Sequence, residues 1–333
     1  MKRYGNLFGK TFTRETMYFA YLSARKHKRK TKSCLEFSAS LGAEIDQLLL
    51  EINSGLYQPS AYRQLQVTHP KPRVIHAPCF RDVVVQHTIH ATIYSVFDRT
   101  FIDTSMACRP GKGTHAASNY AYRAMQSVDP DGYTLHLDVE KFFASIDHGI
   151  LLSLLRDKIK DNRMLEEMKK FFGPFRRGLV LGNLLSQLYA LIYLNPIDHY
   201  VKRELKVKRY VRYVDDMIFV GLEKQEALDV RGKVERYLAD HLKLGLSKWA
   251  MRKVRDGINF VGYRTWPSHR LIRKFSLQKF RRAVQRNNEE AAWSIIAHAQ
   301  RTSSVAAMRR IISCRPAMVE RLPAAHKMRL GIC

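Results

Sequence analysis

An acidic pair between two short apolar strands is the feature that most constrains this chain. Asp215 and Asp216 separate the segments YVRYV and MIFVG, whose β-branched and aromatic residues predict two strands around a tight turn over residues 209–221. Adjacent carboxylates repel each other unless a cation neutralises them. A solvated hairpin turn would also accept two aspartates. The pair therefore predicts a strand–turn–strand unit, with a cation site as one of two interpretations.

A second acidic residue ends another strand. Residues 133–138, YTLHLD, alternate in polarity and end at Asp138. Two such strand ends would place Asp138 and Asp215 side by side. Carboxylates in this arrangement suit two Mg²⁺ ions about 3.5–4 Å apart, which activate a hydroxyl and stabilise a leaving oxygen. The two acidic strand ends together therefore favour a two-metal site over an isolated solvated turn.

The overall charge indicates what such a site would act on. The chain has 57 Lys and Arg against 30 Asp and Glu, a formal net charge of +27, while 46% hydrophobic residues suffice for a folded core. Basic residues occur along the whole length, so a neutral enzyme with a short basic tail is excluded. A charge of this size indicates a polyanionic partner. Charge and carboxylates together predict phosphoryl transfer on nucleic acid, by a polymerase or a nuclease.

The remaining pattern predicts an α+β chain. Helices are predicted over residues 35–54, 81–99, 148–172, 183–194 and 224–243 and from about 275 onward. Strands are predicted over residues 133–138, 209–221 and 258–266, and two more over 61–78 around the turn Pro70-Lys71-Pro72. Neither GxGxxG nor GxxxxGK[ST] occurs, so Rossmann and P-loop folds lack their fingerprints.

Three classes of protein fit this sequence poorly. The basic N-terminus has no long apolar core, so no signal peptide is predicted. The most apolar stretch, residues 179–197, contains Asn183, Ser186 and Gln187 and predicts a buried helix rather than a membrane span. The five cysteines are scattered without a CxxC pair, which favours free thiols in a reducing cytosol over a disulfide scaffold or zinc site.

Six sequence blocks resemble one family, the reverse transcriptases, in the family's order. Tyr213-Val214-Asp215-Asp216 resembles the YxDD box, and Asp138-Val139-Glu140-Lys141-Phe142-Phe143, whose Asp138 lies 77 residues before Asp215, resembles the first catalytic motif. The other four blocks resemble the basic fingers hairpin, the RPG block, the GxxxS segment and the FLGY primer-grip strand. They are, respectively, Lys71-Pro72-Arg73, residues 107–115, residues 181–187 and residues 258–263.

Two residues point to a subfamily. Most reverse transcriptases carry Gln before the Gly of GxxxS and Pro after its Ser, where this chain has Leu181 and Gln187. This is similar to the reverse transcriptases of diversity-generating retroelements, which copy a template RNA repeat and misincorporate opposite adenine. Two alternatives stay open: another bacterial reverse transcriptase, from a retron, a phage-defence system or an intron-derived lineage, and a non-catalytic RNA-binding relic of a polymerase.

The resemblance implies a set of catalytic and nucleotide-binding residues. Asp138, Asp215 and Asp216 would be catalytic and would hold two Mg²⁺ ions with the Val139 carbonyl, and Mn²⁺ would be able to substitute. Phe143 would exclude a 2′-hydroxyl by bulk. The other nucleotide-binding residues would be Lys71 and Arg73 on the triphosphate, and Leu181, Gly182 and Gln187 near the nascent pair, with Val139 and Phe143 in the same pocket.

The resemblance also implies template and primer contacts and partners. The template and primer residues would be Arg109, Lys112, Gly262, Tyr263, Arg273 and Lys274, and Lys248 is a candidate proton donor in a loop after the YxDD strands. The implied partners are deoxynucleoside triphosphates, a structured template RNA, the RNA–cDNA heteroduplex and a small basic, oligomeric accessory protein, with no membrane. A cytoplasmic protein, encoded by a bacterium or phage, is expected.

The implied fold is a right-hand polymerase with fingers, a palm containing an antiparallel sheet, and a short helical thumb. The predicted parts are a basic helical extension over residues 1–60 and fingers over 61–132. A palm follows over 133–266, with inserted fingers helices at about 148–180. The thumb and basic C-terminal helices occupy 267–333.

Overall fold

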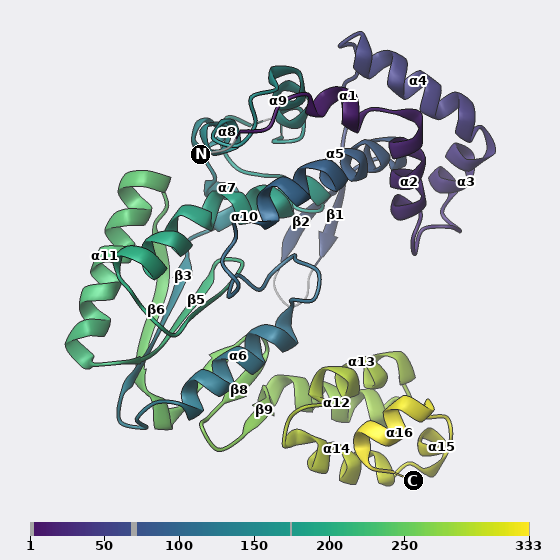
Figure 1. Ribbon diagram of the computed structural model, residues 1–333. Helices are drawn as coiled ribbons and strands as arrows, with labels where there is room; N and C mark the ends of the chain where they lie inside the picture. The colour runs from purple at the N-terminus through teal and green to yellow at the C-terminus, as the bar shows by residue number, and fades with distance from the viewer. Residues whose placement is uncertain (1–2, 68–71, 174, 333) are drawn as a thin grey trace. The chain divides into compact units, whose positions relative to one another are not determined.

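The computed structural model describes residues 3–67, 72–173 and 175–332 of the protein (Figure 1). The chain divides into two compact units that interleave in sequence. The first comprises Met1–Ile102, Val139–Tyr200 and Val234–Ser247, and the second comprises Asp103–Asp138, Val201–Lys233 and Lys248–Cys333. The boundaries predicted for extension, fingers, palm and thumb stay predictions.

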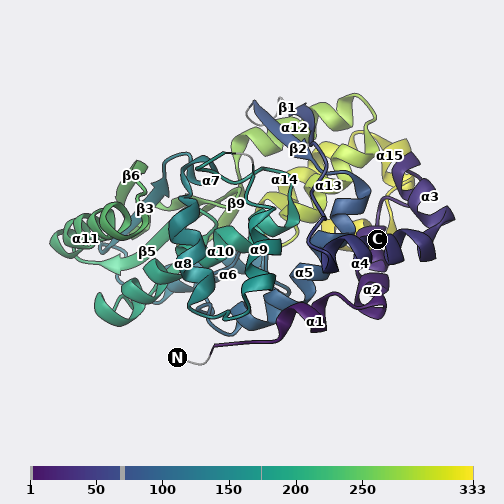
Figure 2. The same ribbon diagram turned by 90° about the horizontal axis from the view of Figure 1, so that it is seen from above.

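The first unit is helical apart from one hairpin. Strands β1 (Arg63–Val67) and β2 (Arg73–Ala77) pair antiparallel, with Leu65 opposite Ile75. Both views show α2 beside α5 (Figure 1 and Figure 2). The helices are α1 (Leu7–Thr11), α2 (Arg14–Ala24), α3 (Lys32–Ala39), α4 (Leu41–Asn53), α5 (Phe80–Asp98), α7 (Phe142–Ser145), α8 (His148–Arg156), α9 (Asn162–Lys169) and α10 (Leu184–His199). A π-helical turn, Tyr200–Glu204, begins at the end of α10 and crosses into the second unit.

Two helices predicted in this unit are each divided in two. The segment 35–54 covers α4 and the end of α3, which are separate because Ser40 leaves the helical conformation at φ −122° and ψ 34°. The segment 148–172 contains α8 and α9, and Asp161 caps α9 by accepting a hydrogen bond from the Met164 amide. The buried helix predicted over 183–194 is confirmed as α10, which extends to His199.

The second unit contains the main sheet. Its strand order is β4-β5-β3-β6, from Tyr210–Tyr213, Asp216–Leu222, Tyr133–Val139 and Leu246–Lys253, with β3 and β4 each antiparallel to β5. Helix α6 (Thr114–Gln126) packs Ala117 and Ala121 against Ile218 of the sheet. Helix α11 (Lys224–Leu242) follows β5 and passes from the second unit into the first after Lys233. The strands predicted around Asp138 and Asp215 are therefore confirmed, and the antiparallel sheet confirms the α+β class.

The C-terminal part of the second unit differs from the prediction in one place. The single strand predicted over 258–266 is wrong, since Val261 and Gly262 take φ of 42° and 92° and turn the chain. The result is a three-stranded sheet of β7 (Ile258–Phe260), β8 (Tyr263–Thr265) and β9 (Arg270–Ile272), preceded by a 3₁₀ turn, Val254–Asp256. The predicted C-terminal helices are confirmed as α12 (Lys274–Gln285), α13 (Glu289–Ala299), α14 (Ser304–Ser313), α15 (Pro316–Glu320) and α16 (Ala324–Leu330), which share one apolar core.

Four of the five cysteines lie in the described part of the chain. Cys34, Cys79, Cys108 and Cys314 are free thiols, and Cys333 lies outside the described residues. Within those same residues no helix is long and apolar enough to cross a membrane.

Candidate active site

The acidic turn is a tight hairpin in the second unit. Tyr213 pairs with Asp216, so Val214 and Asp215 alone form the turn between β4 and β5. Val214 has φ +56°, a left-handed conformation that is unfavourable for a β-branched residue. Strain of this kind persists only where the surroundings hold it, and it clusters at functional sites. The hairpin therefore fixes the position of Asp215 at the expense of backbone strain.

A buried arginine supports this turn. Arg212 is 1% exposed, and its Nη1 donates to the Val214 carbonyl at 2.8 Å while its Nη2 donates to Ser105 Oγ at 3.2 Å. A guanidinium under the turn also places positive charge near the two carboxylates. Sequence reasoning missed Arg212. The available signal was a charged residue inside a strand whose neighbours are all apolar or aromatic.

The first acidic strand end meets the hairpin. Asp138 lies directly opposite Asp216 on the neighbouring strands β3 and β5. Residues paired in this way have Cβ atoms about 4.5–5.5 Å apart on one face of the sheet. Asp215 is next in the chain, and all three aspartates are partly exposed. The structure thus brings the three predicted catalytic carboxylates to one end of the sheet, with Asp216 rather than Asp215 in register with Asp138.

The donor set fits a hard divalent cation. Among the described residues, no three His, Cys, Asp or Glu side chains converge into a complete metal site. Mg²⁺ commonly uses one or two carboxylates together with substrate phosphates and waters, rather than a cage built from protein alone. The pair Asp138 and Asp216, with Asp215 beside it, supplies such carboxylates, and none of the three is a soft ligand.

A histidine holds one carboxylate of this group. His136 Nε2 lies 2.9 Å from Asp216 Oδ1, and His136 precedes Asp138 by two positions on β3, which places both side chains on one face. This contact orients Asp216 and occupies one of its oxygens. It therefore supports the expectation that Asp216 is the weaker metal ligand. His136 was not predicted, although its spacing from Asp138 was a usable signal.

The GxxxS segment lies in the first unit and is clamped to β2. Gly182 has φ +107°, and a Cβ built there would lie 2.7 Å from the His76 carbonyl oxygen and 2.8 Å from Ile75 Cγ2. The His76 amide donates to the Leu181 carbonyl at 2.8 Å. Asn183 then caps α10 by accepting from the Leu185 amide at 2.9 Å. The close backbone approach therefore explains the glycine and joins the β1–β2 hairpin to the segment.

We expect Gly182→Ala to lower the free energy of unfolding of this unit by about 1–3 kcal/mol, because alanine is strained at this φ and collides with β2. Urea unfolding followed by circular dichroism measures the change. Gly232→Ala is the matched control: Gly232 lies within α11, and a Cβ added there would meet nothing within 4 Å, so that change should be neutral or stabilising. Equal effects of the two variants would contradict the clamp.

The two adjacent phenylalanines of the first motif differ in exposure. Phe142 is 2% exposed and packs near Tyr193, whereas Phe143 is partly exposed. This supports Phe143, rather than Phe142, as the residue that faces a nucleotide. The other residues predicted for the pocket also lie in the first unit. Val139 is buried, Leu181 is partly exposed, and Gln187 is exposed on α10.

The basic residues predicted to bind nucleotide or template differ in their surroundings. Lys71 lies outside the described residues, and of Arg73 only the backbone, at the start of β2, is described. Lys112 forms an ion pair with Asp103 at 2.5 Å, and this hydrogen bond holds the pKa of the Asp103 carboxyl below its usual value. Arg109 Nη1 donates to the Ser105 carbonyl at 3.1 Å. The Lys112 charge is thus already partly neutralised.

The predicted primer-side residues surround a cavity in the second unit. Arg273 and Lys274 are exposed and line a cavity of about 790 Å³ together with His136, which contacts Asp216. The Tyr263 side chain is 1% exposed, and burial raises its pKa to about 12. The Tyr263 hydroxyl donates to the His298 carbonyl at 2.8 Å, so this side chain holds α13 against the β8–β9 hairpin and does not face a primer. A guanidinium and an ammonium group on the wall of this cavity suit the phosphates of a primer.

The predicted proton donor has a different setting from the one expected. Lys248 is exposed on strand β6 and not in a loop. The strand was missed because LSKWAMRK carries three charges and its residues are only partly buried, as on a sheet edge. Its role stays a prediction.

Comparison with known proteins gives the family. Residues 66–265 match the family described as reverse transcriptase (RNA-dependent DNA polymerase). The group II intron-encoded protein LtrA of Lactococcus lactis subsp. cremoris is 28% identical over 207 residues, which cover 57% of this chain and 34% of that protein. Protein YkfC of Escherichia coli (strain K12) is 27% identical over 304 residues, which cover 76% of this chain and 78% of that protein.

This chain therefore spans about a third of the length of LtrA. Among solved structures, telomerase from Candida albicans in complex with a TWJ fragment of telomeric RNA is similar over 82% of this chain and 59% of that chain, with 11% identity and a TM-score of 0.49. The family match over residues 66–265 covers more than half of the chain and contains all six sequence blocks described above. It confirms the predicted family and its polymerase fold class. The chain belongs to the reverse transcriptase family.

Proposed function

We propose that this protein is an RNA-directed DNA polymerase that synthesises cDNA on a template RNA. The observation that carries the proposal is the register of Asp138 with Asp216 beside the strained turn that holds Asp215. A solvated turn needs neither a buried arginine beneath it nor a third carboxylate opposite it. A non-catalytic relic would have no reason to retain this arrangement.

Each residue of the proposed active site has a distinct role. Asp138, Asp215 and the Val139 carbonyl would hold two Mg²⁺ ions, with Asp216 as a weaker ligand. When bound, these ions activate the primer hydroxyl and stabilise the leaving pyrophosphate oxygen. Arg212 holds the turn by its bond to Val214, and His136 orients Asp216. Arg273 and Lys274 contact the primer strand by its phosphates.

We infer a mutagenic reverse transcriptase of a diversity-generating retroelement as the finer function. Leu181 and Gln187 support it, since both depart from the residues most reverse transcriptases carry there. In that role the chain would copy a structured RNA with errors at template adenines, assisted by a small basic, oligomeric accessory protein. A second candidate, an intron-derived reverse transcriptase, is favoured by the likeness to LtrA, an intron-encoded protein.

Primer extension on an RNA template tests the main proposal. The full chain should add deoxynucleotides with Mg²⁺, and excess EDTA should stop the addition. Absence of extension on several primed RNAs at saturating Mg²⁺ would overturn it. Sequencing of the cDNA separates the two finer functions: errors concentrated at template adenines support the retroelement enzyme, and an even distribution supports the intron-derived one.

We expect Leu181→Gln to lower misincorporation opposite template adenine about tenfold or more while polymerisation continues. Glutamine adds a donor and an acceptor at similar size, and polar contacts of this kind are worth about 1–3 kcal/mol in discrimination. Deep sequencing of cDNA from one RNA template measures the rate. Leu181→Met, which adds no hydrogen-bonding group, is the control. An adenine error rate in Leu181→Gln that is no lower than in the control would exclude Leu181 as a fidelity residue.

A further inference from the structure

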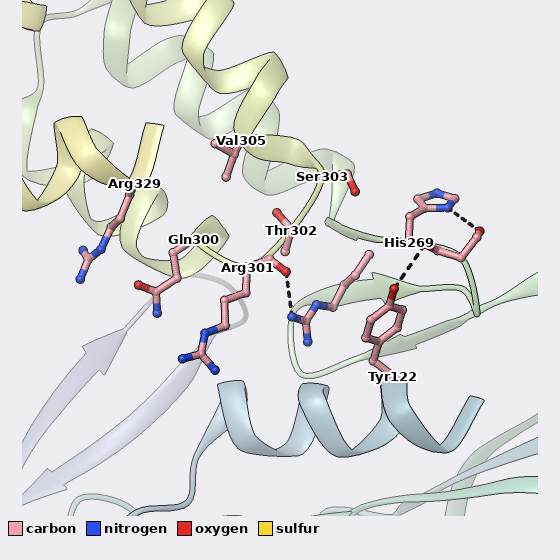
Figure 3. Close-up of a pocket in the computed structure, with 10 residues that line it drawn as sticks. Tyr122, His269, Gln300, Arg301, Thr302, Ser303, Val305 and Arg329 are labelled. Carbon is pink, nitrogen blue, oxygen red and sulfur yellow. Dashed lines mark hydrogen bonds between the residues drawn. The ribbon is translucent and has the colours of Figure 1, made fainter. Parts of the chain in front are cut away.

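A second pocket in the second unit is lined by arginines (Figure 3). It has a volume of about 360 Å³. Gln300 and Arg301 come from the turn between α13 and α14, Arg329 comes from α16, and their side chains extend in the same direction, while Tyr122 on α6 lies across from them (Figure 3). Arg270 of β9 completes the positive lining. This volume suits a small polar group together with part of the molecule to which that group is attached.

In the part of the chain that the structure describes, the positive charge of this pocket has no acidic partner, and the rings of Tyr122 and Tyr263 lie 5.5 and 5.3 Å from the Arg270 guanidinium. No Asp or Glu lines it, and none of the ion pairs among the described residues involves Arg270, Arg301 or Arg329. From residue 257 to the C-terminus the only acidic residues are Glu289, Glu290 and Glu320, and Glu289 is already paired with Arg321. Three guanidinium groups that share one pocket repel each other, so an anion between them would lower their energy.

One of the three arginines is fixed in place and buried. Arg270 is 6% exposed; its Nη1 donates to Ser118 Oγ at 2.8 Å and to Asn119 Oδ1 at 2.9 Å, and its Nη2 donates to the Arg301 carbonyl at 2.8 Å. Its Nε is buried without a partner in the described structure. These neutral acceptors orient the guanidinium without cancelling its charge. A buried charge kept in this way usually has a ligand or a charged partner.

The three arginines also act together on a nearby histidine. Burial, and then the positive charges of Arg301, Arg270 and Arg329, lower the pKa of His115. His115 is held by Tyr263 Oη at 3.0 Å, on the same side of the β8–β9 hairpin. The three arginines therefore act on one small region and are not dispersed over the surface.

We propose that this pocket binds a phosphate group. Guanidinium forks match phosphate oxygens, the hydroxyls of Thr302 and Ser303 add polar atoms at its wall, and the positive N-terminal end of α14 begins beside them. The pocket differs from the primer-side cavity. Arg270, Arg301 and Arg329 line this pocket and not the cavity that contains His136, while Ser303 borders both. The phosphate belongs to a strand of RNA, an assignment that rests on the proposed function, or to a free phosphorylated molecule.

Arginine footprinting on the full, unmodified chain tests the pocket. Phenylglyoxal modification of each arginine is followed by mass spectrometry, with inorganic phosphate and with a single-stranded RNA oligonucleotide as separate probes. At about ten times the Kd, the modification of Arg301 and Arg329 should slow about tenfold. Arg310 and Arg315, exposed on the same helical bundle but outside the pocket, serve as internal controls.

Protection by RNA alone assigns an RNA phosphate, and protection by inorganic phosphate as well assigns a free phosphorylated ligand. No protection, or equal protection of all four arginines, overturns the proposal.

A pair of double variants gives a second measurement. Arg301→Gln with Arg329→Gln should weaken binding of the probe that protects, whereas Arg310→Gln with Arg315→Gln removes the same charge elsewhere and should not. If RNA is the ligand, the slope of log Kobs against log salt should fall by about 0.7 for the lost phosphate contact. Equal losses in both double variants contradict a specific pocket. Neither measurement needs nucleotide addition. If a probe protects these arginines but the chain does not extend a primer, the proposed function is overturned and the phosphate pocket stays in place.

Discussion

Asp215→Asn is expected to reduce nucleotide addition by about a thousandfold or more while leaving RNA binding nearly unchanged. The carboxylate sits in a strained two-residue turn beside the paired Asp138 and Asp216 and is a proposed metal ligand, and metal stabilisation of transition-state charge is worth several kcal/mol. The basic surface proposed to bind RNA is not altered by this change. The loss should therefore appear in the rate of addition and not in the affinity.

Single-turnover primer extension and a filter-binding assay on the same RNA give the two quantities. Asp256→Asn is the matched control, since Asp256 is exposed in the second unit, away from the acidic hairpin, and the substitution removes the same charge. Circular dichroism establishes that both variants are folded. Extension by Asp215→Asn at a rate near that of the control would remove Asp215 from the catalytic group, and an equal fall in RNA affinity would point to misfolding instead.

The elements predicted best were those whose pattern is strong and local. The strands around Asp138 and Asp215 alternate clearly, and α10 has a continuous apolar run, so their positions follow from sequence alone. Helix α6 was missed because its buried face is made mainly of Ala117, Ala121 and Ala124. Alanine is small and only weakly hydrophobic, so this face contrasts less with the exposed face than larger apolar residues would. The position of the helix is fixed by packing on the sheet, which a one-dimensional pattern does not contain.

The residues of the candidate site were also predicted only in part. The three aspartates come together as expected, but the register that places Asp138 opposite Asp216 depends on which strand pairs with which. The supporting residues Arg212 and His136 could not be assigned, since a polar residue in a strand is identified as functional only once its partner is known. The clamp between Gly182 and His76 joins residues more than 100 positions apart and depends on the tertiary fold in the same way.

Phe143→Ala is expected to admit ribonucleotides, lowering the preference for deoxyribonucleotides by up to about a hundredfold. A steric clash with a 2′-hydroxyl is worth about 1–3 kcal/mol, and that clash disappears with the ring. Phe143 is partly exposed, so the change should cost little stability. Phe142 is 2% exposed, and Phe142→Ala should instead cost about 3–5 kcal/mol of unfolding free energy without altering sugar choice.

Competition between a ribonucleotide and its deoxyribonucleotide on one primed RNA measures the preference, and urea unfolding measures the stability of each variant. The two phenylalanines are adjacent, with ring centroids 5.4 Å apart, so one substitution serves as the control for the other. Exposure alone separates their expected effects, because a ring packed in a core cannot meet a substrate and a ring at the surface contributes little to the core. An unchanged sugar preference in Phe143→Ala would place the 2′-hydroxyl against another residue. A changed preference in Phe142→Ala, with stability kept, would exchange the roles of the two.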